Sequence, residues 1–467
     1  MPEFDVIVIG AGPVGENAAG RCAAGGLSTA IVERELVGGE CSYWGCVPSK
    51  TLIRPGDVIA AARRAPGAAE AVTRAVDVQK ALAQRDYMTS NWDDSGQLPW
   101  LEDNDIQLFR GIGRLTGTKR VDVEKPDGTH EGLSARKAVV LATGTRALLP
   151  PIPGLADVDP WDNRSVTGMK AVPKRLAVIG GGAVGAEMAQ AVKRLGAEAV
   201  TVIEGLPRML AREEPFAGEQ VQKAFEADGI VVHTGTTVTA ASRDDDGQVR
   251  LSLSEGDDVV ADEVLVSVGR RVSTGDLGLD AVGLIPGKPV QVNDRLVAVD
   301  VDGNTGDSEW LYAVGDCNGL VLLTHMGKYQ ARIVGDVILG KPSRDRASKD
   351  VIPRVTFTDP QVAAVGLTEQ QVTERGIHYR VVTTPTGGVS GAYVQGNGIE
   401  GTCQLVVDED RQVIIGATFT GPDIAELLHS ATVAIIGAVP MADLWHAVPS
   451  FPTVSEVWLR LLEAYGL

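Results

Sequence analysis

A glycine-rich pattern occurs twice in this sequence, and both copies have the same kind of neighbours. The first copy, Gly10 to Gly15, follows a short run of β-branched residues and leads through an alanine-rich stretch and a second apolar run to Glu33. The second copy, Gly180 to Gly185, leads in the same way to Glu204, and the two copies begin 170 residues apart. Strand, glycine turn, helix, strand and terminal acid are typical of a dinucleotide-binding βαβ unit. The duplication therefore predicts an α/β chain with two dinucleotide sites.

Each part of the pattern has a physical reason. The first glycine permits the tight turn, the second lets the backbone approach a pyrophosphate at the helix N-terminus, and the third lets helix and strand pack closely. The acid accepts hydrogen bonds from ribose hydroxyls. A carboxylate at Glu204 also repels the 2′-phosphate of NADPH, so we expect NADH at the second site. Arg208, four residues later, is interpreted as a solvated surface residue and not as a phosphate ligand.

Two cysteines, Cys41 and Cys46, are five positions apart in the stretch that follows the first unit. In a regular helix their Cα atoms would be about 8.5 Å apart, beyond the roughly 7 Å that a disulfide can bridge. If they bond, the segment must be a distorted first turn, for which Gly45 supplies the freedom. We interpret them as a redox-active pair; the alternative is two unrelated buried thiols. Buried thiols are what we expect of the other three cysteines, Cys22, Cys317 and Cys403.

Composition excludes several classes of protein. The net charge of −18, from 43 basic and 61 acidic residues, argues against a nucleic-acid or anionic-membrane partner. Five cysteines in 467 residues do not form a secreted disulfide scaffold. The first residues lack the basic start of a signal peptide, and no apolar run reaches the roughly 18 residues of a membrane span. We therefore expect a cytoplasmic enzyme, with no metal site.

The order of the segments predicts more than one domain. A proline-rich linker, 149–154, separates the two glycine-motif units, and strand-like runs alternate with polar turns from about residue 351 to the apolar stretch 426–436. This change of pattern indicates a separate α+β module after two Rossmann-like domains. The expected segments are 1–150 for the first part of the first nucleotide domain, 151–272 for the second nucleotide domain, 273–347 for the remainder of the first, and 348–467 for the C-terminal module.

Four motifs in the same order resemble those of the pyridine nucleotide–disulfide oxidoreductases. They are Gly10 to Gly15, Cys41 to Lys50, Gly180 to Gly185, and Gly315-Asp316. This family of flavoproteins includes dihydrolipoamide dehydrogenase, glutathione reductase, mycothione reductase and mercuric reductase, and the resemblance covers essentially the whole chain. It implies FAD in the first nucleotide domain, a nicotinamide nucleotide in the second, and a homodimer formed through the C-terminal module.

The resemblance also implies roles for single residues. Cys46 would face the flavin as the charge-transfer thiolate, Cys41 would be the exposed interchange thiol, and Lys50 would reach the flavin and pair with Glu187. The alternative for the last two is a pair of solvated surface charges. The implied FAD-binding residues are Gly10, Gly12, Gly15, Glu33, Gly39, Lys50, Thr143, Gly144 and Asp316, and those implied for the nicotinamide nucleotide are Gly180, Gly182, Gly185, Glu204 and Gly269.

The C-terminal motif departs from the family. Disulfide reductases of this family carry a histidine before a Pro-Thr pair, supplied by the partner subunit, and a glutamate five residues on. Here Phe451 stands at the histidine position and Glu456 is retained. A phenylalanine has no proton to transfer, so the usual acid–base step is missing. His446 and His325 are candidates to replace it, although we expect a packing or surface role for both.

A second departure surrounds the interchange thiol. Glu40 stands where the family usually has threonine, and its carboxylate is expected to raise the pKa of Cys41. Tyr43 and Trp44 replace smaller residues and are expected to reshape access to the loop. These changes leave the nucleotide motifs intact and affect the disulfide end of the reaction.

Three functions remain open from the sequence. The first is NADH-dependent reduction, through Cys41 and Cys46, of a disulfide or thiol-linked substrate. The second is an NADH-dependent quinone reductase, diaphorase or oxidase that works directly from the flavin. The third is a non-catalytic redox-sensing flavoprotein. The final residues, 462–467, carry no cysteine pair, which argues against mercuric reductase.

Overall fold

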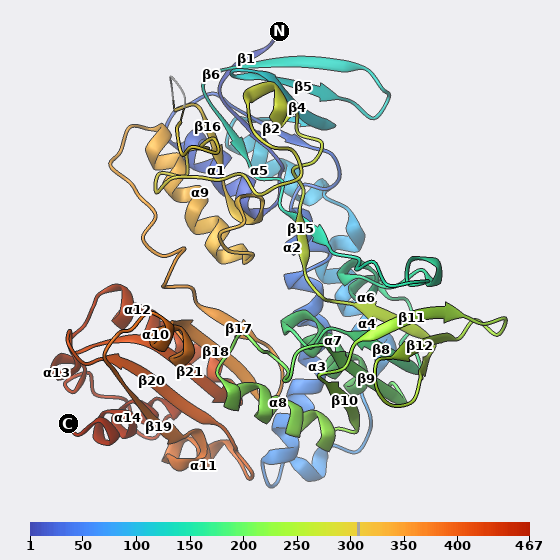
Figure 1. The fold of residues 1–467 in the computed structure, drawn as a ribbon, viewed down its shortest axis with the longest axis vertical. Helices are drawn as coiled ribbons and strands as arrows, with labels where there is room; N and C mark the ends of the chain where they lie inside the picture. The colour runs from blue at the N-terminus through green and yellow to red at the C-terminus, as the bar shows by residue number, and fades with distance from the viewer. Residues whose placement is uncertain (306–308) are drawn as a thin grey trace. The chain divides into compact units, whose positions relative to one another are not determined.

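The computed structural model describes residues 1–305 and 309–467. The chain folds into two compact units, each assembled from three separate segments (Figure 1). Unit 1 contains Met1–Pro48, Asp86–Ala147 and Gly269–Lys349, and unit 2 contains Ser49–Arg85, Leu148–Val268 and Asp350–Leu467.

Unit 1 is built on a seven-stranded sheet. Its strands follow the order β3-β2-β1-β6-β5-β4, with β16 paired to β6. The four strands β3, β2, β1 and β6 are mutually parallel, and so is β16, whereas β5 and β4 continue the sheet as an antiparallel hairpin. The strands are β1 (Glu3–Ile9), β2 (Thr29–Glu33), β3 (Ile106–Arg110), β4 (Ile112–Gly117), β5 (Arg120–Glu124), β6 (His130–Leu141) and β16 (Leu311–Ala313).

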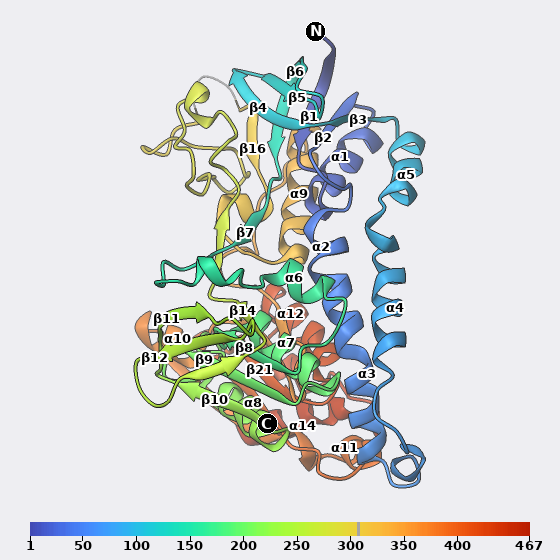
Figure 2. The same ribbon diagram turned by 90° about the vertical axis from the view of Figure 1, so that its right-hand side faces the viewer.

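Alternate residues of the central strands fill two cores. Val6 and Val8 of β1 belong to one cluster, and Ile7 and Ile9 belong to another, because successive strand residues point to opposite faces. Helices α1 and α9 cover the first cluster and lie side by side in Figures 1 and 2. The helices of unit 1 are α1 (Pro13–Ala24), α2 (Gly39–Tyr43), α5 (Leu98–Asp103) and α9 (Thr324–Ile338), and a small antiparallel pair consists of β7 (Thr145–Ala147) and β15 (Arg270–Val272).

Unit 2 contains the second glycine motif, on a parallel sheet of order β10-β9-β8-β14 beside an antiparallel sheet of order β11-β12-β13. The strands are β8 (Arg175–Ile179), β9 (Ala199–Glu204), β10 (Ile230–Thr234), β11 (Val238–Arg243), β12 (Val249–Leu253), β13 (Val259–Ala261) and β14 (Glu263–Val266). The helices are α6 (Asn163–Gly168), α7 (Ala183–Arg194) and α8 (Pro215–Ala227). The chain leaves unit 1 within α3 (Cys46–Arg64) and returns to it within α4 (Val78–Met88).

The C-terminal module of unit 2 is an antiparallel sheet of order β17-β18-β21-β20-β19 with helices around it. Its apolar core joins the sheet to the last helix, for example through Phe419 against Trp458. The strands are β17 (Arg354–Thr356), β18 (Gln361–Gly366), β19 (Tyr379–Pro385), β20 (Thr402–Asp408) and β21 (Val413–Gly421), and the helices are α10 (Glu369–Glu374), α11 (Ser390–Gln395), α12 (Leu428–Ile436), α13 (Met441–Leu444) and α14 (Val457–Tyr465).

The predicted fold class is confirmed: two Rossmann-like βαβ arrangements and a C-terminal α+β module are present. The domain boundaries at residues 150, 272 and 347 stay predictions. Within the described part of the chain, no helix is both long and apolar enough to cross a membrane.

Candidate functional site

The first glycine turn joins β1 to α1, and its glycines meet different constraints. Gly10 has φ +103°, and a Cβ there would lie 2.5 Å from the carbonyl oxygen of Ala142. A Cβ at Gly15 would lie 1.8 Å from the carbonyl oxygen of Gly10. At Gly12 a Cβ would meet only the Cα of Gly39, at 3.9 Å, beside a helix start that no described side chain caps. The open space at Gly12 fits a pyrophosphate approaching the helix N-terminus.

Glu33, the last residue of β2, is fixed by the glycine turn. Its Oε2 accepts a hydrogen bond from the backbone N–H of Ala11 at 2.8 Å, and its Oε1 accepts one from the N–H of Glu35 at 2.7 Å. The residue is 9% exposed, and burial raises the pKa of its carboxyl. The acid therefore stands at the end of the strand where a ribose would lie.

Thr143, Gly144 and Asp316 follow the adjacent parallel strands β6 and β16. Asp316 Oδ2 accepts a hydrogen bond from Thr145 Oγ1 at 2.6 Å, and Arg270 Nε donates to the same Thr145 Oγ1 at 2.6 Å. Burial raises the pKa of Asp316. Thr143 Oγ1 is buried and has no hydrogen-bond partner among residues 1–305 and 309–467, and a Cβ at Gly144 would meet nothing within 4 Å. This edge of the sheet thus combines an unmatched hydroxyl with open space, as a cofactor site requires.

The two cysteines lie on either side of a break between two helices. Cys41 belongs to the short helix α2, Trp44 ends it with φ −137°, and Cys46 begins α3. The segment is therefore distorted, as a bridge between residues five apart requires. Cys46 Sγ lies 3.4 Å from Thr324 Oγ1, and a Cβ at Gly39 would lie 2.6 Å from the Cα of Gly12. All five cysteines are thiols in this structure.

The pKa of Cys41 is raised, as expected, and its largest causes are other than the neighbouring carboxylate. The hydrogen bond with Cys46 is the largest cause, and burial is the second. The Glu40 carboxylate, expected to act on Cys41, lies 4.0 Å from Arg270 Nη2. The sequence could not indicate this pairing, because Arg270 is 230 positions away and no motif joins the two residues.

The second glycine turn, between β8 and α7, repeats the first. Gly180 has φ +105°, and a Cβ at Gly185 would lie 2.0 Å from the carbonyl oxygen of Gly180. A Cβ at Gly182 would meet nothing within 4 Å, beside the start of α7, which no described side chain caps. Gly269, expected at the same site, has φ +147°, directly precedes β15 and belongs to unit 1.

Glu204 ends β9 and is held by the second turn. Its Oε2 accepts from the backbone N–H of Gly181 at 2.6 Å, and its Oε1 accepts from the N–H of Leu206 at 2.7 Å. Arg208 is not a solvated surface residue, which corrects the expectation. Its Nη2 donates to the carbonyl oxygens of Ala211 at 3.0 Å and Glu213 at 2.9 Å, and its Nε is buried.

Lys50 and Glu187 form an ion pair with 2.7 Å between Nζ and Oε2. Glu187 is only 6% exposed, so the two are not a pair of solvated surface charges. The other oxygen of Glu187 accepts from the backbone N–H of Phe357 at 3.0 Å, and Lys50 Nζ lies 4.7 Å from the centre of the Phe357 ring. A buried carboxylate therefore fixes the ammonium group in one direction.

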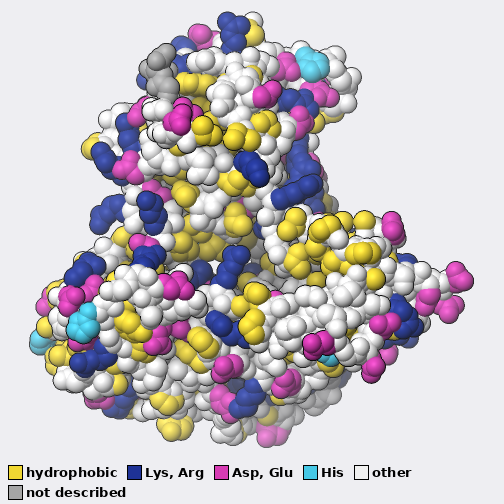
Figure 3. Space-filling view, viewed as in Figure 1, with side chains coloured by type: hydrophobic (Ala, Val, Ile, Leu, Met, Phe, Trp, Pro, Cys, Tyr) yellow, Lys and Arg dark blue, Asp and Glu magenta, His cyan; other side chains and the backbone are white. Residues whose placement is uncertain are grey.

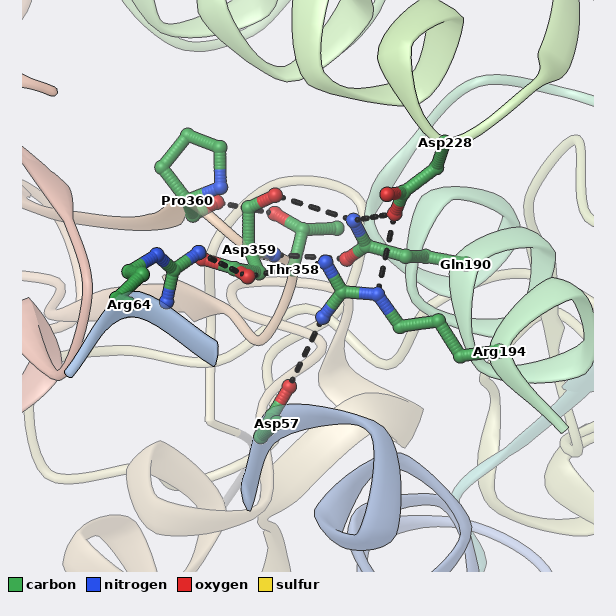
Figure 4. A network of polar contacts seen from close by, with 8 residues as sticks. All are labelled: Asp57, Arg64, Gln190, Arg194, Asp228, Thr358, Asp359 and Pro360. Atoms are coloured by element: carbon green, nitrogen blue, oxygen red, sulfur yellow. Dashed lines mark hydrogen bonds and ion pairs between the residues drawn. The ribbon is translucent and has the colours of Figure 1, made fainter. Parts of the chain in front are cut away.

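The loop 357–360, between β17 and β18, is also held by residues farther along α7. Figure 4 shows this network, which the sequence did not reveal. Gln190 accepts from the backbone N–H of Asp359 at 2.7 Å and donates to its carbonyl oxygen at 3.0 Å. Arg194 pairs with the Asp359 carboxylate at 2.9 Å and with Asp228 at 3.1 Å, and Arg64 also pairs with Asp359. Lys50, Asp57 and Arg64 of α3 are seven residues apart and pair with Glu187, Arg194 and Asp359 in turn. This regular spacing of charged residues was the one sequence signal that could have indicated the network.

The C-terminal motif shows an exposed Phe451 and a buried Glu456. Phe451 is 74% exposed, whereas Glu456 is 7% exposed and its Oε2 has no hydrogen-bond partner among the described residues. The two histidines considered as replacements, His446 and His325, are both exposed. His446 lies after α13, and His325 is the second residue of α9.

The C-terminal module exposes several large apolar side chains. Elsewhere, acidic and basic side chains are interspersed over the face of the molecule that Figure 3 shows. Exposed apolar side chains mark contacts with other protein surfaces where they form a contiguous patch. They are Tyr393, Val394, Val433, Ile436, Trp445, Val448 and Phe451.

Comparison with protein families gives two matches. Residues 4–331 match the family described as pyridine nucleotide-disulphide oxidoreductase, and residues 352–461 match the dimerisation domain of that family. The second match agrees with the homodimer expected from the sequence.

Curated relatives are similar along nearly the whole chain. A dihydrolipoyl dehydrogenase of Thermus scotoductus is 33% identical over 472 residues, covering 99% of this chain and 98% of the relative. A mercuric reductase of Staphylococcus aureus is 30% identical over 459 residues, covering 97% of this chain and 81% of the relative.

Solved structures share the fold. The HOCl-induced flavoprotein disulfide reductase RclA from Escherichia coli is 24% identical with a TM-score of 0.85, covering 99% of both chains. The family matches and the full-length relatives agree with the duplicated glycine turns, their acids and the cysteine pair at a helix break. The chain therefore belongs to the pyridine nucleotide–disulphide oxidoreductases, a family of enzymes that use FAD and a pyridine nucleotide.

Proposed function

We propose that this protein is an NADH-dependent flavoprotein that reduces a disulfide or a thiol-linked electrophile through Cys41 and Cys46. The observation that carries the proposal is the cysteine pair itself: Cys41 in α2 and Cys46 at the start of α3 lie on either side of a helix break. The overall change is NADH, a proton and a disulfide converted to NAD⁺ and two thiols.

The two thiols have different tasks. Bound FAD would supply the hydride acceptor for NADH and the two electrons that reduce the Cys41–Cys46 disulfide. The start of α3 favours negative charge on Cys46, because the first N–H groups of a helix have no intrahelical acceptors. The hydrogen bond with Cys46 and burial raise the pKa of Cys41, and in the proposed cycle the remaining proton of the pair would stay on Cys41. To attack a substrate disulfide, Cys41 must lose this proton, and a mixed disulfide with the substrate follows.

Lys50, Glu33, Asp316 and Glu204 would orient the cofactors. The Lys50 ammonium, held by Glu187, would face the flavin ring, and Glu33 and Asp316 would accept hydrogen bonds from its ribose and ribityl hydroxyls. Glu204 would accept from the ribose of NADH. Arg208 donates to two backbone carbonyl oxygens, so it is not placed to bind a 2′-phosphate, which supports NADH over NADPH.

The proton for the leaving thiol is the unusual part of the proposal. We infer that Phe451 occupies the position of the family's histidine, so the partner subunit would offer a ring without a proton. Glu456 keeps an acceptor oxygen with no hydrogen-bond partner in the described chain.

The location in the cytoplasm also stays a prediction.

A second function is NADH-dependent quinone reduction, diaphorase or oxidase activity. The raised pKa of Cys41 and the phenylalanine at position 451 favour it. A Cys41 that holds its proton tightly is a poor nucleophile, and Phe451 supplies no acid. The electrons would then leave directly from bound flavin, and the cysteines would be dispensable.

The deciding experiment is an anaerobic NADH titration of the wild type beside Cys41→Ala, followed by turnover with a panel of disulfides and with a benzoquinone. Disulfide turnover that disappears in Cys41→Ala supports the first function. Quinone turnover that survives in Cys41→Ala, with no reaction of any disulfide, supports the second. A flavin that NADH does not reduce would refute both and leave a redox-sensing protein.

Phe451→His is the matched gain-of-function variant for this panel. If the missing acid limits disulfide reduction, we expect about a tenfold or larger increase in turnover, because Glu456, the partner that the family resemblance implies for this histidine, keeps an acceptor oxygen with no hydrogen-bond partner among the described residues. Unchanged turnover would place the limitation at the cysteine loop instead.

A further inference from the structure

A left-handed turn of three consecutive residues follows α4. Ser90, Asn91 and Trp92 have φ values of 50°, 52° and 57°. The backbone N–H of Trp92 donates to the carbonyl oxygen of Thr89 at 2.8 Å, and that of Asp93 donates to Ser90 at 3.0 Å, which closes the turn. Residues with a Cβ adopt this region singly and seldom in succession. Such a conformation persists only where its surroundings fix it, and it is common beside functional sites.

The turn directs the indole of Trp92 to the helix that carries Cys41. Trp92 Nε1 donates to the carbonyl oxygen of Tyr43 at 3.1 Å, and Tyr43 is the last residue of α2. Carbonyl groups in the last turn of a helix have no partner within the helix. The indole therefore caps the C-terminal end of α2 from outside.

Asp94, two positions after Trp92, holds the chain just before α2. Asp94 Oδ2 accepts from the backbone N–H of Val37 at 2.7 Å and from Arg110 Nη2 at 2.5 Å. The Tyr43 hydroxyl donates to the carbonyl oxygen of Val37 at 3.0 Å. Contacts from the segment 90–94 thus fix the chain just before α2 and at its end.

We infer that the left-handed turn positions the redox-active loop, with Trp92 and Asp94 as positioning residues for Cys41. A helix of five residues, Gly39–Tyr43, is too short to be stable by itself. Its attachment at both ends keeps Cys41 within hydrogen-bonding reach of Cys46. The inference rests on the proposed function, because it takes Cys41 as the exchanging thiol.

The test is Trp92→Phe in the holoenzyme, a change that keeps an aromatic ring and removes the N–H donor. After reduction with dithiothreitol, we would measure amide hydrogen exchange in residues 38–46 and the separate rates at which iodoacetamide alkylates Cys41 and Cys46. We expect exchange and Cys41 alkylation to rise about fivefold or more, because the helix end loses its cap. Unchanged exchange and alkylation would overturn the inference. Asp94→Asn is the second variant and should act in the same direction.

Two controls separate positioning from general loosening. Trp100→Phe makes the same chemical change on α5 and should leave residues 38–46 as in the wild type. Asn91→Gly keeps the turn, because glycine adopts the left-handed conformation without strain, and it keeps the indole donor, so Cys41 alkylation should stay within about twofold of the wild type. If Asn91→Gly released α2 as fully as Trp92→Phe, the indole would have no special part and the inference would fail.

The outcome is independent of the substrate. Dithiothreitol reduces the pair without NADH, so a released α2 is detected even in a protein that reduces no disulfide. Failure of the proposed function would appear differently, as absent flavin reduction or absent disulfide turnover in the wild type with α2 still protected. Flavin reduction by NADH should change less than about twofold in Trp92→Phe, because the indole N–H that is removed donates to Tyr43 and not to either glycine turn.

Discussion

The two glycine motifs of this chain have the same skeleton and different surroundings. In both, the terminal acid of the second strand accepts from the amide between the first two glycines, at 2.8 Å for Glu33 and 2.6 Å for Glu204. Glu33 is buried and burial raises its pKa, whereas Glu204 is partly exposed. The first helix carries Glu16 at the position where the second carries Ala186. The backbone geometry is therefore common to both sites, and the side chains around it distinguish them.

The largest expected effect comes from filling the third glycine of each motif. Gly15→Val and Gly185→Val would each place a Cβ within about 2 Å of a carbonyl oxygen, at 1.8 Å and 2.0 Å respectively. We expect Gly15→Val to abolish flavin retention, and Gly185→Val to keep the flavin and lose its reduction by NADH. Flavin absorbance after purification and anaerobic NADH titration measure the two effects.

The matched control for this pair is Gly182→Ala. A Cβ there meets nothing within 4 Å, so thermal unfolding should be unchanged, while the apparent affinity for NADH should fall about tenfold because the pyrophosphate loses its approach. If both valine variants lost the flavin equally, the two sites would not be separable and the comparison would break down.

A smaller effect is expected at the acid of the second site. Glu204→Arg removes the repulsion of a 2′-phosphate and should shift the ratio of NADH to NADPH activity about 100-fold toward NADPH, or roughly 2.7 kcal/mol. Steady-state kinetics with both nucleotides measure the ratio. Arg208→Gln should move it far less, because Arg208 donates to backbone carbonyl oxygens. An unchanged ratio in Glu204→Arg would remove this residue from cofactor choice.

The smallest expected effect concerns Glu16, which has no counterpart in the second motif. Burial raises the pKa of Glu16 from 4.5 to about 7, so between these values the folded chain holds more protons than the unfolded one. The contribution of Glu16 to the free energy of unfolding therefore falls as pH rises through this window and stays reduced above about pH 7. We expect Glu16→Gln to stabilise the apoprotein by about 1 kcal/mol near pH 8, after allowing for partial solvent exposure, and to change little near pH 4.

Urea unfolding at the two pH values measures the difference. An equal effect of Glu16→Gln at both would show that the carboxyl does not titrate in this range. Ala186→Glu is the reciprocal variant, and it should introduce the same pH dependence into the second motif, because Ala186 is fully buried.

The sequence predicted the strands of both nucleotide units closely, because a buried parallel strand is a short apolar run with a sharp end. The runs 5–9 and 175–179 became β1 and β8, and the acids Glu33 and Glu204 end β2 and β9 as expected. The apolar stretch 426–436 was less clear, since it divides into a short 3₁₀ turn, Ile424–Leu427, and the helix α12. Val433 and Ile436 of this helix stay exposed, on the module that matches a dimerisation domain.

The contacts of the candidate site were less predictable than its residues. Cys41, Cys46, Lys50 and Glu187 could be named from motifs, but the pairing of Glu40 with Arg270 joins distant segments and leaves no local pattern. The left-handed turn 90–92 also leaves no signal in the sequence, because none of its residues is a glycine. Local propensity describes elements, whereas such contacts depend on the tertiary fold.

The difference in exposure between the two acids has a consequence for time. A ligand held at a buried acid must wait for the surrounding chain to open before it can leave, whereas one held at an open acid can leave directly. Glu33 suits a group with a residence time of many turnovers, and Glu204 suits one that is exchanged in every turnover. One duplicated skeleton would thus provide a slow site and a fast site, and the proposed catalytic cycle would use both.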